Sequence, residues 1–179
     1  VIGGSVALTT LDINQSAGTI AMSIPGIGGA SAGVTGATRI GNTGSGDITF
    51  TANGANAYNF GGSLTVTSDG GAGAFTFTNA PTITAGGAVA FNEGSGTDDT
   101  MVLADLKDVS ITTASANTDI TLPNIDGTAG DGNDGTDLTV NAGTGTVNLE
   151  SIDNDINDLQ VTGGTIKLGG SITTAAHNA

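Results

Sequence analysis

Apolar and polar residues alternate along this chain in short units of three, in which a small polar residue usually stands between two apolar ones. The unit occurs at 48–50, 64–66, 75–77, 120–122, 138–140, 147–149, 159–161 and 166–168. Strict alternation places successive side chains on opposite faces of a β-strand. The stretches between the units are rich in Gly, Asn, Asp and Ser, which favour turns. The pattern therefore predicts many short strands, each with one buried face.

The clearest internal repeat lies near the C-terminus. Val140 and Val161 hold equivalent places in two similar phrases, and so do Leu149 and Leu168. Fainter echoes at a similar spacing join Leu64, Ile83 and Leu103. A period of about 20 residues is typical of solenoids, in which each coil supplies two or three strands. It predicts a parallel β-helix of roughly nine coils, stacked at the strand spacing into a rod on the order of 40 Å long.

A pair of tandem β-sandwich domains is the alternative fold. Turn signals every 8–12 residues also suit sandwiches, and two units of about 90 residues each would fill the chain. The chain has no Trp, a single Tyr and short strands, which favour a solenoid rather than two sandwiches. We therefore expect one solenoid that spans residues 1–179. A compositional break near 92–100 would be a long loop on one coil or a linker between units. Only 101–108 could form a short amphipathic helix.

Composition narrows the range of partners. The net charge is −14, and Arg39, Lys107 and Lys167 are the only residues that carry a full positive charge at pH 7. Nucleic acid and anionic membranes are therefore poor partners, because binding them needs a basic surface. The chain has no Cys, so no disulfide framework exists. The sequence contains no run of 18 apolar residues, which a transmembrane helix would need.

The acidic loop at 126–137 is the best candidate for a ligand site. Calcium takes six to eight oxygen ligands, which a flexible Gly-rich backbone can supply together with carboxylates. An ordinary solvated turn is the alternative, because turns prefer the same residues. The candidate ligands are Asp126, Asp131, Asn133, Asp134 and Asp137. Two further acidic clusters are more simply read as exposed corners, namely Asp153, Asp155 and Asp158, and Glu93, Asp98 and Asp99.

Catalytic constellations are not evident. Residues 29–33 match the G-x-S-x-G pattern around Ser31, but that motif requires a strand before it, a helix after it, and a His and an acid nearby. His177 is the only histidine. Paired carboxylates at 98–99 suit a glycosidase, although basic residues to hold an acidic sugar are scarce. Thr-x-Thr triplets at 65–67, 76–78 and 82–84 suggest a flat Thr face, but Asn148, Gln160 and Lys167 take the outward place later in the chain, so the ordinary β-propensity of Thr is the preferred explanation. We expect no enzymatic activity.

The phrases at 138–150 and 159–174 resemble a repeat of large bacterial exoproteins, the filamentous-haemagglutinin-like and β-strand-repeat surface proteins. This resemblance implies a right-handed parallel β-helix, secretion to the bacterial cell surface, and a role in adhesion or matrix building. It carries over no catalytic residue. Residues 130–134 are also similar to the calcium-binding nonapeptide of RTX proteins, although Ala129 and Thr136 depart from its pattern.

These observations together predict a structural extracellular scaffold, an adhesin segment or a fibre-forming segment. Neither Val1-Ile2 nor Ile172-Thr173 looks like a cap, and solenoids need caps to cover open strand edges. We therefore expect the ends to pair with other copies or to continue in a longer chain, with a cell-surface or glycan ligand as a further partner. The alternative is a calcium-dependent β-sandwich module that binds a carbohydrate or another cell-surface ligand.

Overall fold

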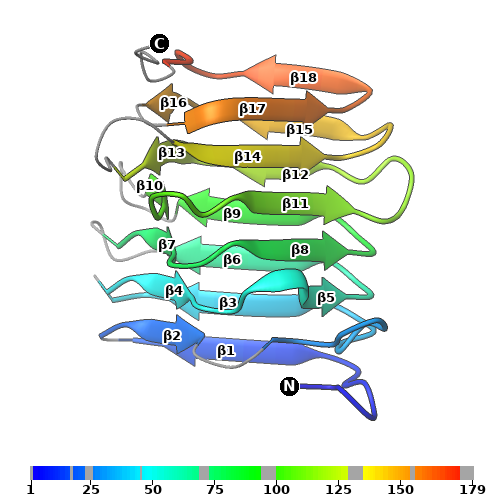
Figure 1. The fold of residues 1–179 in the computed structure, drawn as a ribbon. Coiled ribbons are helices and arrows are strands. Elements are labelled where there is room, and N and C mark those ends of the chain that lie inside the picture. The colour runs from blue at the N-terminus through cyan, green and yellow to red at the C-terminus, as the bar shows by residue number, and fades with distance from the viewer. Residues whose placement is uncertain are drawn as a thin grey trace.

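The structure is a computed structural model that describes residues 2–16, 18–22, 26–44, 46–68, 73–93, 100–128, 135–153 and 156–173. Over these residues the chain forms eighteen β-strands and no helix. The strands form three sheets that run along the molecule, and the chain visits each sheet in turn (Figure 1). The described N- and C-terminal residues lie at opposite ends of the stack (Figure 1).

Sheet 1 contains seven strands: β1 (Leu11–Gln15), β3 (Thr38–Asn42), β6 (Leu64–Ser68), β9 (Val89–Glu93), β12 (Ile120–Leu122), β15 (Thr146–Leu149) and β18 (Thr165–Leu168). Sheet 2 contains six: β2 (Ile20–Met22), β4 (Ile48–Phe50), β7 (Phe75–Phe77), β10 (Thr100–Leu103), β13 (Asn124–Gly127) and β16 (Ile152–Asp153). Sheet 3 contains five: β5 (Gly54–Phe60), β8 (Pro81–Ala85), β11 (Val109–Thr113), β14 (Thr136–Asn141) and β17 (Ile156–Thr162).

The fold is a β-solenoid of stacked parallel coils, as the alternation predicted. Neighbouring strands in all three sheets pair in parallel, for example β4 with β7 and β11 with β14. β-Sandwiches are built from antiparallel strands, so the alternative of two tandem sandwich domains is wrong. Sheets 1 and 2 continue past residues 92–100, because β9 pairs with both β6 and β12 and β10 pairs with both β7 and β13.

The predicted coil length is correct only for the last coil. Val140 pairs with Val161 and Leu149 pairs with Leu168, so the C-terminal sequence repeat is a true coil repeat. The fainter echoes were wrong, because they join strands of different sheets. Leu64 of sheet 1 pairs with Val89 of the same sheet, whereas Ile83 belongs to sheet 3.

Earlier coils are longer because their connecting segments are longer. Val89 pairs with Ile120, so one coil extends from position 89 to position 120, whereas the last extends only from 149 to 168. Within the described residues, the chain therefore passes sheet 1 seven times rather than nine. Six inter-strand steps at the usual spacing give a stack about 29 Å long instead of 40 Å.

The interior is a set of apolar columns that run along the stack. One column of sheet 2 consists of fully buried side chains in register, namely Ile48, Phe75, Met101, Ile125 and Ile152. Alternation within each strand directs these residues inward and their neighbours outward, so strands such as β6 read buried, half-buried, buried. Each coil therefore buries its apolar residues against the coils before and after it.

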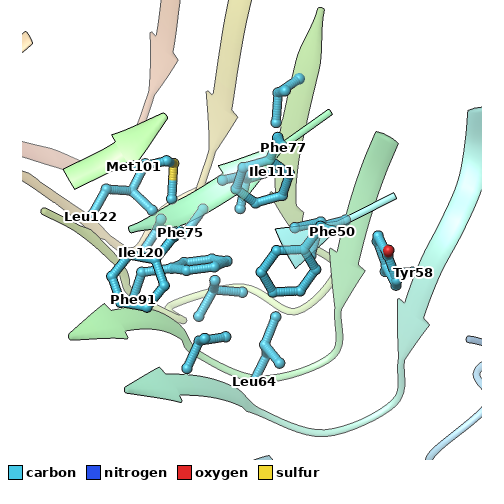
Figure 2. Packing of buried hydrophobic residues seen from close by; sticks show 14 of the residues in the cluster. Phe50, Tyr58, Leu64, Phe75, Phe77, Phe91, Met101, Ile111, Ile120 and Leu122 are labelled. Atoms are coloured by element: carbon cyan, nitrogen blue, oxygen red, sulfur yellow. The ribbon is translucent and has the colours of Figure 1, made fainter. Parts of the chain in front are cut away.

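Aromatic residues fill the interior of the N-terminal half. Phe50 and Phe77, which are paired in register, stack with ring centroids 4.8 Å apart and planes 9° from parallel. Phe91 from sheet 1 meets both rings edge-on at 5.9 Å, and Tyr58 from sheet 3 meets Phe50 at 5.5 Å. Figure 2 shows these rings converging between the sheets. The aromatic cluster thus joins all three sheets in the middle of the stack.

The short helix that 101–108 could have formed is absent from the structure. Met101 and Leu103 belong to β10, where both side chains are fully buried in the sheet 2 columns. The chain then turns through Leu106, which has φ of 57° and is 52 % exposed. Extended pairing on both sides of β10 overrides the weak helical pattern, because a helix there would leave a gap in sheet 2.

Candidate functional site

The outward face of sheet 3 carries two parallel columns of hydroxyl and amide side chains. One column contains Thr82, Ser110, Thr139 and Gln160, and the other contains Asn59, Thr84, Thr112, Asn141 and Thr162. The register brings one member of each column onto every coil from β8 to β17. This face can offer regularly spaced donors and acceptors, at the strand spacing of about 4.8 Å, to a polar ligand.

The three Thr-x-Thr triplets do not form one face. Thr65 lies on sheet 1, Thr76 on sheet 2 and Thr82 on sheet 3. The outward residues of the later alternating units are also divided between sheets. Asn148 and Lys167 share a column of sheet 1, whereas Gln160 lies on sheet 3. A search at a longer coil spacing would have found the polar face, because Thr-Ile-Thr at 82–84 recurs as Ser-Ile-Thr at 110–112 and Thr-Val-Asn at 139–141.

Polar side chains on the outside of the stack bond one coil to the next. Asn148 Nδ2 donates to Thr121 Oγ1 at 3.2 Å, and Ser151 Oγ donates to Asn124 Oδ1 at 2.6 Å. Each pair is separated by 27 residues, which is one coil. Their hydrogen-bonding groups therefore serve contacts within the stack.

Several aspartates accept a backbone N–H from the following coil. Asp47 Oδ1 accepts from Ala74 N at 3.0 Å, Asp119 Oδ1 accepts from Thr146 N at 2.7 Å, and Asp108 Oδ1 accepts from Asp137 N at 3.3 Å. A carboxylate is a strong acceptor for such a bond. Part of the acidity of this chain is thus explained by bonds between coils.

Two of the predicted calcium ligands lie in the described residues. Asp126 lies on β13 and is half-buried, and Asp137 lies on β14 of a different sheet. The carboxylate of Asp137 accepts bonds from Asn157 Nδ2 at 3.2 Å and from the backbone N–H of Asp158 at 3.1 Å. Asp131, Asn133 and Asp134 lie outside the described residues. The calcium site stays a prediction, and the described residues alone contain no group of three His, Cys, Asp or Glu that could hold a metal ion.

The members of the other two acidic clusters also lie on different sheets or outside the described residues. Asp153 is exposed on β16 and pairs in register with Asp126 of the previous coil. Asp158 is exposed on β17, in a different sheet. Glu93 ends β9, whereas Asp98, Asp99 and Asp155 lie outside the described residues. The residues around one hollow at the C-terminal end include Asn124, Glu150, Asp153 and Gly170.

The G-x-S-x-G pattern lies in a bend and not at a strand-to-helix turn. Gly29 N–H donates to the carbonyl oxygen of Ser31 at 3.0 Å, and Gly33 N–H donates to the carbonyl oxygen of Asn59 in the next coil at 2.8 Å. The motif therefore closes a corner of the coil. His177 lies outside the described residues.

Buried Tyr58 is the described ionisable group whose environment is most distinctive. Its side chain is 1 % exposed, and its hydroxyl oxygen accepts the N–H of Ala52 at 3.1 Å. Burial raises the pKa of Tyr58 above its ordinary value of 10.0, and the backbone bonds from Ala52 and Thr51 oppose part of that rise. The side chain of Tyr58 is therefore a neutral phenol that packs in the core.

The two ends of the stack expose apolar side chains that the middle coils bury. In the last coil, Ile166 is 46 %, Leu168 53 % and Ile172 43 % exposed. In the first coil, Leu11 and Ile13 are only partly buried. β1 and β18 are the two edge strands of sheet 1, so among the described residues each presents an unpaired row of backbone groups.

Comparison with known proteins found no match to this chain. No family model matches the chain, and no curated protein or solved structure matches it. The described residues also include no helix that could cross a membrane.

Proposed function

We propose that this chain is a structural segment of an extracellular scaffold, in which a stiff stack of coils is the functional element. The observation that carries the proposal is that polar residues on the outside, like apolar residues inside, are used to join successive coils. Thr146 N–H bonds to Asp119, and Ser151 bonds to Asn124, each across 27 residues. Load applied along the stack is then shared by backbone ladders, side-chain bonds and core packing.

The aromatic cluster supports the same role. Its rings come from β4, β5, β7 and β9, so it ties three consecutive coils and all three sheets together. Aromatic pairs contribute about 0.5–1.5 kcal/mol beyond the area that they bury. A middle section of this kind resists the local opening that would bend the stack.

We further propose export to the bacterial cell surface as part of an adhesin or fibre. The support is the resemblance of residues 138–174 to bacterial exoprotein repeats, together with a Cys-free and strongly acidic composition. Protease treatment of intact producing cells should remove the segment from the surface fraction, and a segment found only in the cytoplasmic fraction would contradict this location.

Single-molecule force spectroscopy tests the scaffold role. The chain is tethered by its two ends between identical handles, beside a helical bundle of equal length in the same handles. We expect the solenoid to unfold at the higher force, and Phe77→Ala to lower that force. Unfolding of the wild-type chain at or below the force of the bundle would contradict the proposal.

The polar face of sheet 3 favours a second candidate function, which is attachment to a neutral glycan. Its two columns present hydroxyl and amide groups on a regular surface, and Thr112 lies in the middle of one column. Wild-type chain and Thr112→Lys would be tested on an array of glycans, with Thr65→Lys on sheet 1 as the matched control. Binding that only Thr112→Lys weakens would support the proposal, whereas no binding would contradict it.

A further inference from the structure

The first and last coils present matching surfaces, and this match is clearest in sheet 1. In β18, Ile166 and Leu168 continue the inward columns and Lys167 continues an outward column. In β1, Leu11 and Ile13 begin those same inward columns, and Asp12 begins that outward column. The register pairs run without a gap from Leu11 to Ile166 and from Asp12 to Lys167, through β3, β6, β9, β12 and β15. Ile13 and Leu168 occupy the next inward position, which lies beyond the end of the ladder between β9 and β12.

The charges at the two ends of this outward column are opposite. The column reads Asp12, Arg39, Thr65, Ala90, Thr121, Asn148 and Lys167. Lys167 is exposed on the last strand, and Asp12 is exposed on the first. Opposite charges directly across neighbouring strands stabilise their pairing. A second copy placed after β18 would bring its Asp12 beside Lys167.

The other two sheets match in the same way. In sheet 2, Ile172 forms a parallel bridge with Ile152 at the C-terminal end, and Ile20 starts the same inward column at the N-terminal end. In sheet 3, Val161 ends the inward column that Ile2 begins through its bridge to Ile27. Each end therefore offers an apolar position in all three sheets, in the same chain order.

We propose that the last coil of one copy of this chain binds the first coil of a second copy, head to tail. β18 then pairs in parallel with β1 of the next copy, with Ile166 opposite Leu11, Lys167 opposite Asp12 and Leu168 opposite Ile13. The proposal rests on the scaffold function and names the partner that extends it. Four inward columns, an open backbone edge and one charge pair are completed by the same placement.

The local charge favours this contact despite the net charge of −14. Asp12 is the only charged side chain in residues 2–22, so the first coil carries little of the overall repulsion. Salt at physiological strength screens the remaining acidic residues beyond about 8 Å. A copy approaching in the opposite sense would place two last coils together and bring Lys167 against Lys167.

Sedimentation velocity on the full chain, over a hundredfold range of concentration at physiological salt, tests the docking. We expect wild type to form linear multimers whose size grows with concentration. Lys167→Glu and Asp12→Lys should each weaken association on the order of tenfold, because each places like charges across the junction. The double variant, which reverses the pair, should recover most of the loss.

Lys107→Glu is the matched control, because it makes the same charge change in the turn after β10, away from both ends. It should leave association unchanged. Leu168→Asp should abolish association while circular dichroism stays that of wild type, because Leu168 is already 53 % exposed in the single copy.

Three results would overturn the proposal: a wild-type monomer at every concentration, equal effects of Lys167→Glu and Lys107→Glu, or multimers that Leu168→Asp leaves intact. A monomer at every concentration would show that the two end coils do not bind each other. The force measurement is made on single tethered chains, so a monomer that still resists force would overturn the docking and leave the scaffold function standing.

Discussion

The middle coils and the last coil have the same alternating pattern but differ in what the pattern achieves. Phe77 in β7 and Leu168 in β18 both end an apolar-polar-apolar unit. Phe77 is fully buried, whereas Leu168 is 53 % exposed. The difference arises because β7 has a strand on each side and β18 is an edge. Alternation therefore specifies a strand, and neighbouring coils decide whether its apolar face stabilises the fold or remains available for binding.

The largest expected contrast is between core truncations in these two regions. Phe77→Ala should lower the free energy of unfolding by about 3–5 kcal/mol, because it removes a ring packed against Phe50 and Phe91 and leaves a cavity. Leu168→Ala should cost less than about 1 kcal/mol in the monomer, since half of that side chain is exposed. Urea denaturation followed by circular dichroism measures both. Equal losses would contradict the division into a buried middle and an open end.

Corner glycines should show the same contrast at a smaller scale. A Cβ at Gly86 would overlap the backbone carbonyl of Gly61 in the preceding coil, whereas a Cβ at Gly169 would meet its nearest atom, the Cα of Glu150, at an ordinary 3.4 Å. We expect Gly86→Ala to destabilise by about 2–3 kcal/mol, as overpacking does. Gly169→Ala should have little effect. Thermal melts of the two variants at equal concentration would reveal the order, and the reverse order would contradict it.

The same contrast explains which features the sequence could predict. Strand positions, inward faces and the solenoid class depend on local alternation, and the pair of Leu149 with Leu168 was visible because the last coil has short connections. Coil length elsewhere was not visible. The connecting segments vary, so the step from Leu64 to its partner Val89 is shorter than the step from Val89 to Ile120.

Surface features depend on that register and were therefore harder to predict. Whether Thr65, Thr76 and Thr82 share a face could not be decided from the sequence, because the answer depends on the coil length, and the structure places them on three different sheets. The role of Asp119, whose carboxylate accepts a bond from Thr146 in the next coil, also appears only when the coils are aligned. Composition leaves a calcium site and an ordinary turn open at Asp137, because it cannot show that this carboxylate accepts bonds from Asn157 and Asp158.

Tyr58 is buried in the middle coils, and its burial should make the stability of the fold depend on pH. Burial raises the pKa of Tyr58 above 10.0, so the folded state favours the neutral phenol more than the unfolded chain does. Its contribution to stability is complete below the unfolded-state pKa and is lost as pH rises through the folded-state pKa. We expect wild type to lose stability in this range, measured by urea denaturation at a series of pH values.

Tyr58→Phe should remove this alkaline loss. At neutral pH the variant should be less stable by about 1–2 kcal/mol, because the buried N–H of Ala52 loses its acceptor. The single tyrosine of the chain also allows its ionisation to be followed directly by ultraviolet absorbance. An alkaline loss of stability that persists in Tyr58→Phe would assign the effect to other groups.

The smallest expected effect concerns the polar bonds between coils. Asn148 Nδ2 donates to Thr121 Oγ1 at a half-buried position, and Asn148 lies one coil before Lys167 in the same column. Asn148→Ala should cost about 0.5–1.5 kcal/mol, the usual net value of such a bond. A double-mutant cycle with Thr121→Ala should give a coupling of about 0.5 kcal/mol or more. Additive losses would mean that the outer bonds do not stiffen the stack, and that its cohesion comes from the backbone ladders and the apolar columns alone.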